Sequence, residues 1–243
     1  MQHLRITPKI LLLAAAVWIF ATASLTGEVL DKTKNVGGIP VHYKVILPNQ
    51  YDPAKAYPGV LAFGGGPQNM EMVDNTIKRF WRQQAEQRGY LVVLPAAPNG
   101  ILFFEGGERI FPEFLDRILA DYKIQDNKFH ITGMSNGGIS SFHIAALYPR
   151  YFRSITVFPG YLPDDTSERI QNISKMCINM YVGELDTGWL EDMQQQAAKF
   201  RAKGMSVQFA IEKGQGHVPA TLAGDGAHRL FDHFDQASHG CGH

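Results

Sequence analysis

Two kinds of hydrophobic pattern alternate along the chain. Short apolar runs rich in β-branched residues predict buried strands, and stretches with an apolar residue every three or four positions predict helices. Parallel neighbouring strands need a crossover, usually a helix, so this alternation predicts an α/β fold with a mostly parallel central sheet flanked by helices. The predicted strands cover 41–48, 57–67, 90–98, 128–133, 152–160, 176–186 and 205–212, and the predicted helices cover 72–81, 107–122, 139–147, 190–200 and 222–234.

Length and composition predict one domain over residues 24–243. The chain has 243 residues, 45% of them apolar, which is enough for one sizeable core. It contains no internal repeat and no low-complexity linker. Only the short segment 161–175 separates two predicted strands in the second half of the chain, so we expect little or no cap domain there.

Residues 1–23 have the pattern of a signal peptide. Arg5 and Lys9 precede an apolar run from Ile10 to Ala23, which closes on Ala21-Thr22-Ala23. The alternative is a single membrane anchor, but the run is shorter than the roughly 20 residues that cross a bilayer. We therefore expect a secreted or periplasmic protein with no stable membrane association after cleavage.

Charge and cysteine content narrow the possible partners. The 23 basic and 23 acidic residues balance, so no long-range field would attract nucleic acid or anionic lipid. Export would permit a disulfide, but Cys177 opens an apolar strand and Cys241 lies in the C-terminal tail, so we expect two unpaired thiols. His239, Cys241 and His243 in that tail could bind a metal ion, but a disordered terminus explains them as well, and we expect no metal and no other cofactor.

The stretch from Gly133 to Gly137 has the pattern G-x-S-x-G, between a predicted strand and a predicted helix. In this pattern the serine occupies a strained turn, and the glycines leave room for the neighbouring strand and helix. The alternative is a glycine-rich turn that happens to contain a serine. The placement favours Ser135 as a nucleophile exposed at the carboxyl end of the sheet.

A serine needs a base to remove its proton. His217 follows the last predicted strand in a glycine-rich loop, which makes it the predicted base. The other candidates sit inside a strand or along helices, where a core or solvated histidine is the expected state. They are His130, His143, His228 and His233.

The base in turn needs an acid to orient it. Asp186 ends a predicted strand just before a helix and is the predicted acid, although a helix N-cap is an alternative role. Glu184, two residues earlier, is its competitor. Asp164 and Asp165 are more distant alternatives.

Backbone donors and aromatic side chains complete the predicted site. The glycine turn Gly64–Gly66 exposes backbone N–H groups, so Gly65 and the amide after the nucleophile, that of Asn136, are the predicted oxyanion hole. Three aromatic side chains, Phe103, Phe104 and Trp189, are placed to line the mouth of the site. The alternative is that these rings pack beneath loops.

The motifs "GMSNGG", "VGELD" and "GQGHV" follow a Gly-Gly-Gly turn in this order. Over roughly residues 41–234 the sequence resembles the α/β-hydrolase esterases, specifically the secreted polyhydroxybutyrate-depolymerase, feruloyl-esterase and predicted-peptidase group. The resemblance implies an α/β-hydrolase fold, a triad of Ser135, Asp186 and His217, and a carboxylic ester substrate. Many relatives have a histidine before the glycines of the oxyanion turn, where this chain has Phe63.

The sequence thus predicts an exported serine hydrolase that cleaves small-molecule or polymer esters through an acyl-enzyme intermediate, without a cofactor. A peptidase on the same triad is the second interpretation, although no charged pocket for a peptide terminus is evident. A non-catalytic binding protein on a hydrolase fold is the third.

Overall fold

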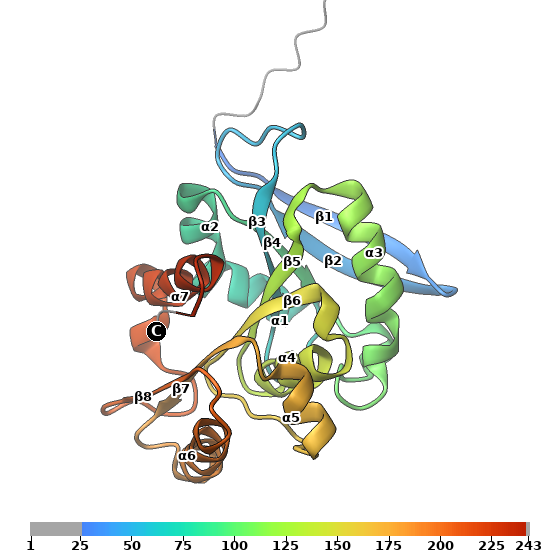
Figure 1. Cartoon of the computed structure of the whole chain (residues 1–243). Helices are drawn as coiled ribbons and strands as arrows, with labels where there is room; N and C mark the ends of the chain where they lie inside the picture. Colours follow the sequence, from blue (N-terminus) through green and yellow to red (C-terminus); the bar gives the residue numbers. More distant parts are fainter. Residues whose placement is uncertain (1–25, 242–243) are drawn as a thin grey trace, which may run out of the picture.

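The strands form one sheet whose spatial order is β1 (Val29–Val36), β2 (Ile39–Ile46), β4 (Leu91–Pro95), β3 (Tyr57–Phe63), β5 (Ile124–Gly133), β6 (Phe152–Val157), β7 (Cys177–Gly183) and β8 (Val207–Glu212) (Figure 1). The computed structural model describes residues 26–241, so the predicted signal peptide lies outside the described residues. β2 pairs antiparallel with β1 and β4, and all other neighbours are parallel. The predicted α/β fold with a mostly parallel sheet is confirmed.

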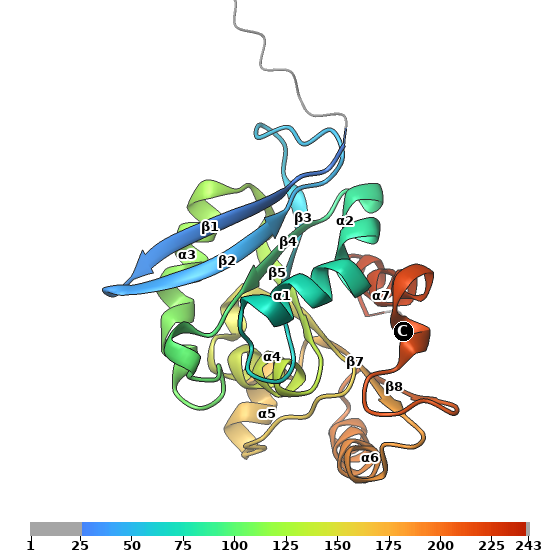
Figure 2. The same cartoon turned by 180° about the vertical axis from the view of Figure 1, so that it is seen from behind.

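Helices cover both faces of this sheet (Figures 1 and 2). On one face, the core contains side chains of α1 (Met70–Thr76), the π-helical turn η1 (Ile77–Trp81), α2 (Arg82–Arg88) and α7 (His228–Ser238). On the other, it contains side chains of α3 (Phe111–Asp121), α4 (Asn136–Leu147), α5 (Ser167–Ile173) and α6 (Thr187–Ala202). Short 3-10 turns lie at η2 (Pro98–Gly100), η3 (Gly107–Ile110), η4 (Pro149–Tyr151), η5 (Ala220–Leu222) and η6 (Gly224–Ala227).

β1 is the strand that the hydrophobic pattern did not predict. Its sequence, VLDKTKNV, is exposed or half-buried at seven of eight positions, because it is an edge strand whose only partner is β2. The buried strands β4 and β7, by contrast, are apolar almost throughout and were predicted from that feature. Apolar periodicity detects burial, so an exposed edge strand gives no such signal.

The segment between β6 and β7 is short and is hydrogen-bonded to α6. Its one helix is α5, and Gln196 of α6 binds both backbone groups of Leu162: Oε1 accepts from its N–H at 2.8 Å and Nε2 donates to its carbonyl at 3.0 Å. No cap domain covers the carboxyl end of the sheet at this point, as predicted.

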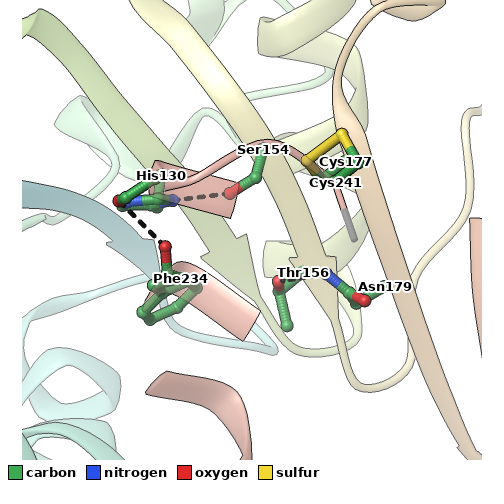
Figure 3. The surroundings of a disulfide bond; sticks show 8 residues. His130, Ser154, Thr156, Cys177, Asn179, Phe234 and Cys241 are labelled. Atoms are coloured by element: carbon green, nitrogen blue, oxygen red, sulfur yellow. Dashed lines mark hydrogen bonds between the residues drawn. A yellow bond between two sulfur atoms is a disulfide. The ribbon is translucent and has the colours of Figure 1, made fainter. Parts of the chain in front are cut away.

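Cys177 and Cys241 form a disulfide, with their Cα atoms 5.2 Å apart (Figure 3). The prediction of two unpaired thiols is therefore wrong. The helix α7 packs along β6, and its end meets the amino end of β7 where Cys177 lies. The sequence does not show where that helix ends relative to the sheet, so it could not predict that Cys241 lies beside Cys177.

Among residues 26–241, no helix combines the length and apolar character that crossing a bilayer requires.

Candidate active site

Ser135 occupies a sharp turn between the end of β5 and the start of α4. Its φ of 55° and ψ of −124° lie in a region that L residues rarely adopt, so the backbone is strained there. The Ser135 N–H donates to the carbonyl of Pro159 at 2.8 Å, which anchors the turn to the segment after β6. This is the strand-to-helix geometry that the G-x-S-x-G pattern predicts.

The glycines around Ser135 allow backbone to lie against backbone. A Cβ on Gly133 would lie 2.4 Å from the Gly137 carbonyl oxygen, and one on Gly137 would lie 2.5 Å from that of Gly64. A Cβ on Gly138 would meet the Pro159 carbonyl oxygen at 2.1 Å. Any side chain at these positions would push the turn away from β3 or from the segment after β6.

The structure brings the three predicted triad residues together in one hydrogen-bonded chain. His217 Nε2 lies 2.8 Å from Ser135 Oγ, and His217 Nδ1 lies 2.7 Å from Asp186 Oδ2. Asp186 stands at the N-cap position of α6, but its side chain makes no cap bond. The carboxylate is available to the imidazole for this reason.

Glu184, the competing acid, has another partner. Its Oε2 accepts the Gly214 N–H at 2.8 Å, so it holds the loop that carries His217 and does not touch the imidazole. The distant alternatives Asp164 and Asp165 form ion pairs with Arg169 and Lys199.

The remaining predicted structural histidines lie away from Ser135. His130 is fully buried, and burial, assisted by the nearby charge of Arg153, lowers its pKa to about 3. Burial also lowers the pKa of His143 and of His233. His228 bonds to the Asp225 carbonyl at the start of α7.

Both predicted oxyanion donors border Ser135. Asn136 is the first residue of α4, where the backbone N–H has no acceptor within the helix. Gly65 lies on the other side: a Cβ on it would be 3.4 Å from Ser135 Cβ and 3.2 Å from the Met134 carbonyl oxygen. The two segments are tied together, because Asn136 Nδ2 donates to the Gly66 carbonyl at 2.9 Å.

The three aromatic side chains predicted to line the mouth of the site lie in different surroundings. Trp189 lies edge-on to His217, with ring centroids 5.2 Å apart, and Tyr161 contacts the Trp189 ring at 5.1 Å. Phe104 is half-buried in the loop after β4. Phe103 is fully buried, so the prediction that it lines the mouth of the site is corrected: its ring belongs to the core.

An ion pair that the sequence did not reveal anchors the loop of His217. Glu212, the last residue of β8, is 8% exposed and accepts from both terminal nitrogens of Arg229, at 2.7 and 2.9 Å. Thr221 donates to the same carboxylate, and these hydrogen bonds hold the pKa of Glu212 below its usual value. The available signal was a carboxylate at the end of a mostly apolar strand, VQFAIE.

Within residues 26–241, no cluster of three or more His, Cys, Asp or Glu side chains is arranged to hold a metal ion.

Solved structures similar to this chain share its architecture. The feruloyl esterase module from Clostridium thermocellum, complexed with sinapinate, aligns over 90% of this chain and 89% of its own at a TM-score of 0.62 and 14% identity. The S-formylglutathione hydrolase from Agrobacterium tumefaciens aligns over 89% of this chain and 97% of its own, at a TM-score of 0.64 and 15% identity. This chain has the α/β-hydrolase fold. Ser135 therefore stands at the strand-to-helix turn of an α/β-hydrolase sheet.

Sequence comparison adds one partial match. Dipeptidyl-peptidase 5 of Porphyromonas gingivalis is 28% identical over an alignment of 135 residues that covers 48% of this chain and 19% of that protein. The chain thus corresponds to about a fifth of the length of this relative. No family model matches the chain.

Proposed function

We propose that this protein is a serine hydrolase that cleaves carboxylic esters through an acyl-enzyme intermediate. The observation that supports this most directly is the chain of two short hydrogen bonds from Asp186 through His217 to Ser135. A nucleophile, a base and an orienting acid in this order are what acyl transfer from a serine requires.

In the proposed reaction, Ser135 Oγ attacks the ester carbonyl while His217 Nε2 takes the hydroxyl proton. The tetrahedral intermediate collapses as His217 returns that proton to the leaving alkoxide, which frees the alcohol. Water then attacks the acyl-enzyme with His217 again as base, and the acid product and Ser135 are released. Asp186 keeps the Nδ1–H tautomer of the imidazole and stabilises the imidazolium.

In this proposal, the backbone N–H groups of Asn136 and Gly65 stabilise the negative charge that develops on the carbonyl oxygen. Neither donor has to reorganise during the reaction, because the first sits at a helix start and the second in a glycine turn. Losing one such donor typically costs about 2.7 to 4 kcal/mol of transition-state stabilisation.

The substrate class is proposed from what surrounds the triad. Trp189 beside His217 and the half-buried Phe104 offer apolar surface to an acyl or alcohol group. Tyr161, whose ring contacts that of Trp189, extends this surface. We propose a small-molecule or polymer ester as substrate, without nucleic acid or cofactor.

A fluorophosphonate probe tests the proposal. Intact mass of the purified protein should show one adduct, and the Ser135→Ala variant should show none and should lose turnover of p-nitrophenyl acetate. A folded wild-type protein that stays unlabelled and does not hydrolyse p-nitrophenyl or feruloyl esters of graded size would contradict the proposal and favour a binding protein.

A peptidase on the same triad is the second candidate, favoured by the partial match to a dipeptidyl peptidase. Comparing kcat/KM for an ester and for the matching p-nitroanilide dipeptides separates the two. We expect the ester to be preferred, because nothing in the described site provides a charged partner for a peptide terminus. The opposite ranking would establish the peptidase.

We also propose export with cleavage after Ala23. The disulfide supports an oxidising compartment, where such bonds persist. N-terminal sequencing of the secreted or periplasmic protein should begin at Ser24. A protein that retains Met1 in the cytoplasm would contradict export.

A further inference from the structure

Gln68 is an unusual residue two positions after the glycine turn. It is 1% exposed, and its φ of 52° places a non-glycine residue in the left-handed region. A buried amide costs free energy unless its polar atoms are bonded, and a strained backbone persists only where its surroundings hold it. Every polar group of Gln68 has a partner.

Two of these contacts go back to the turn that carries the proposed oxyanion donor. The Gln68 N–H donates to the Gly65 carbonyl at 3.1 Å, and Nε2 lies 3.5 Å from the Gly64 carbonyl oxygen. The Gly64 carbonyl belongs to the same peptide unit as the Gly65 N–H, the proposed donor, and the Gly65 carbonyl belongs to the next one. Gln68 therefore contacts the peptide units on both sides of the Gly65 Cα.

A third contact goes to the helix that follows the nucleophile. Gln68 Nε2 donates to Ser140 Oγ at 2.8 Å, and Ser140 Oγ donates to the Asn136 carbonyl at 2.8 Å. This forms a bridge from the turn to the first turn of α4. It runs beside the direct bond from Asn136 Nδ2 to the Gly66 carbonyl.

The last two contacts go to the segment after β4. Gln68 Oε1 accepts the Phe103 N–H at 3.0 Å, and its carbonyl accepts the Ala97 N–H at 2.8 Å. Gln68 thus joins the glycine turn, α4 and the loop after β4, which are distant in the chain.

We infer that Gln68 is a positioning residue that sets the distance between the two oxyanion donors, Gly65 and Asn136. This inference rests on the proposed function. Gln68 is too buried to touch a substrate, so it acts through the turn and through Ser140. The residue before the glycines, Phe63, packs its ring on Phe103 and Phe111 and supplies no polar contact, so the hydrogen bonds come from Gln68.

The experiment compares Gln68→Met with wild type. Methionine keeps the length and apolar bulk of the side chain but removes its hydrogen bonds. We expect kcat for p-nitrophenyl acetate to fall about 30- to 100-fold with KM within about twofold, because a displaced donor matters in the transition state. The pH profile of kcat/KM should stay unchanged, since Ser135, His217 and Asp186 keep their bonds.

Ser154→Ala is the matched control for stability. Ser154 Oγ bonds to the buried His130 Nδ1 at 2.7 Å, on the part of β6 away from the turn, so its loss also leaves a buried polar group unpaired. Both variants are assayed well below their melting temperatures. We expect a lower melting temperature in both, and a fall in kcat in Gln68→Met alone.

Ser140→Ala provides a second, independent readout. It removes the bridge to Asn136 but leaves the bond from Gln68 to Phe103. If the bridge transmits the effect, the double variant should lose little more kcat than Gln68→Met alone, because residues that act as a unit are not additive.

The outcomes separate the two proposals. If wild type neither labels nor hydrolyses esters, the proposed function fails before Gln68 is tested. If wild type is active, a fall in kcat for Gln68→Met no larger than for Ser154→Ala overturns the inference, as does a loss expressed in KM or a shifted pH profile. If the effects of Gln68→Met and Ser140→Ala on kcat are fully additive, the proposed role of the hydrogen-bonded bridge is overturned.

Discussion

At the carboxyl end of the strands, backbone lies directly against backbone, whereas at the amino end of β7 side chains tie the segments together. Around Ser135, glycines let the turns of β3, β5 and β6 approach within distances that no Cβ would permit. At the other end, Cys177 and Cys241 are covalently joined, and nearby His130 bonds to Ser154 (Figure 3). His130 also bonds to Ser238 of α7.

Because of this difference, we expect mutations at the two ends to have different effects. The glycine-rich end positions the groups of the proposed active site and leaves them accessible: the side chain of His217 is 41% exposed. At the cross-linked end, Cys177 and His130 are buried, and Cys241 is half-buried. This end touches no proposed reacting atom and fastens the last helix to the sheet. Changes at the first end should therefore alter turnover, and stability too where an added side chain would meet backbone, whereas changes at the second should alter the free energy of unfolding without altering turnover.

The largest expected effect is at Asp186, the proposed triad acid. Asp186→Asn should lower kcat by about 10⁴-fold, because the amide favours the wrong imidazole tautomer. Glu184→Gln, the matched control two residues away, should cost less than about tenfold, since Glu184 bonds only to the loop backbone. Steady-state kinetics on one ester checks both, and a larger fall in Glu184→Gln would assign the acid to Glu184.

Gly138→Ala should produce the next effect, a loss of about 3 kcal/mol or more in the free energy of unfolding. The added Cβ would lie 2.1 Å from the Pro159 carbonyl oxygen, and backbone must move to relieve that contact. Gly188→Ala in α6 is the control, with no atom within 4 Å of its Cβ, and should be neutral or slightly stabilising. Urea unfolding measures both, and equal losses would contradict the close-packing argument.

Removing the disulfide should cost about 2 to 4 kcal/mol of unfolding free energy, because the bond closes a long loop with a sequence separation of 64. The Cys177→Ser, Cys241→Ser double variant avoids a stray thiol. At 25 °C its kcat should match wild type, since the bond lies at the end of the sheet opposite Ser135. Reduced wild type should melt at the same temperature as the variant. An unchanged melting temperature would show that the helix is held without the disulfide.

The smallest effect is the acid sensitivity that His130 confers. Its folded-state pKa of about 3 lies below the ordinary value of 6.5, so the unfolded state binds the proton first as the pH falls. Stability is therefore retained above about pH 6.5 and lost below it, by about 2 kcal/mol from pH 6.5 to pH 5.

His130→Gln should flatten this dependence without abolishing it, because His143 and His233 also have lowered pKa values. Ser154→Ala keeps the titrating group and should keep the slope. Unfolding free energies at several pH values provide the measurement. Equal slopes in wild type and His130→Gln would show that another group is responsible.

The sequence by itself determined the α/β fold, the turn at Ser135 and the loop of His217. Each depends on a local pattern: runs of apolar residues, glycines at fixed offsets from a serine, and a histidine directly after a strand. Such patterns report the backbone that a segment forms and the burial that it needs. They left open which of Asp186 and Glu184 faces the imidazole.

Only the tertiary structure decided that choice, the burial of Phe103, the pairing of Cys177 with Cys241 and the contacts of Gln68. Each depends on which distant segments the fold brings together. The loop after β8 packs against the end of β7, the aromatic core packs against the loop after β4, and the end of α7 lies at the amino end of β7. These contacts form between surfaces that exist only after the sheet and helices have packed. No local run of residues encodes them, because the partner is set by the geometry of the whole fold.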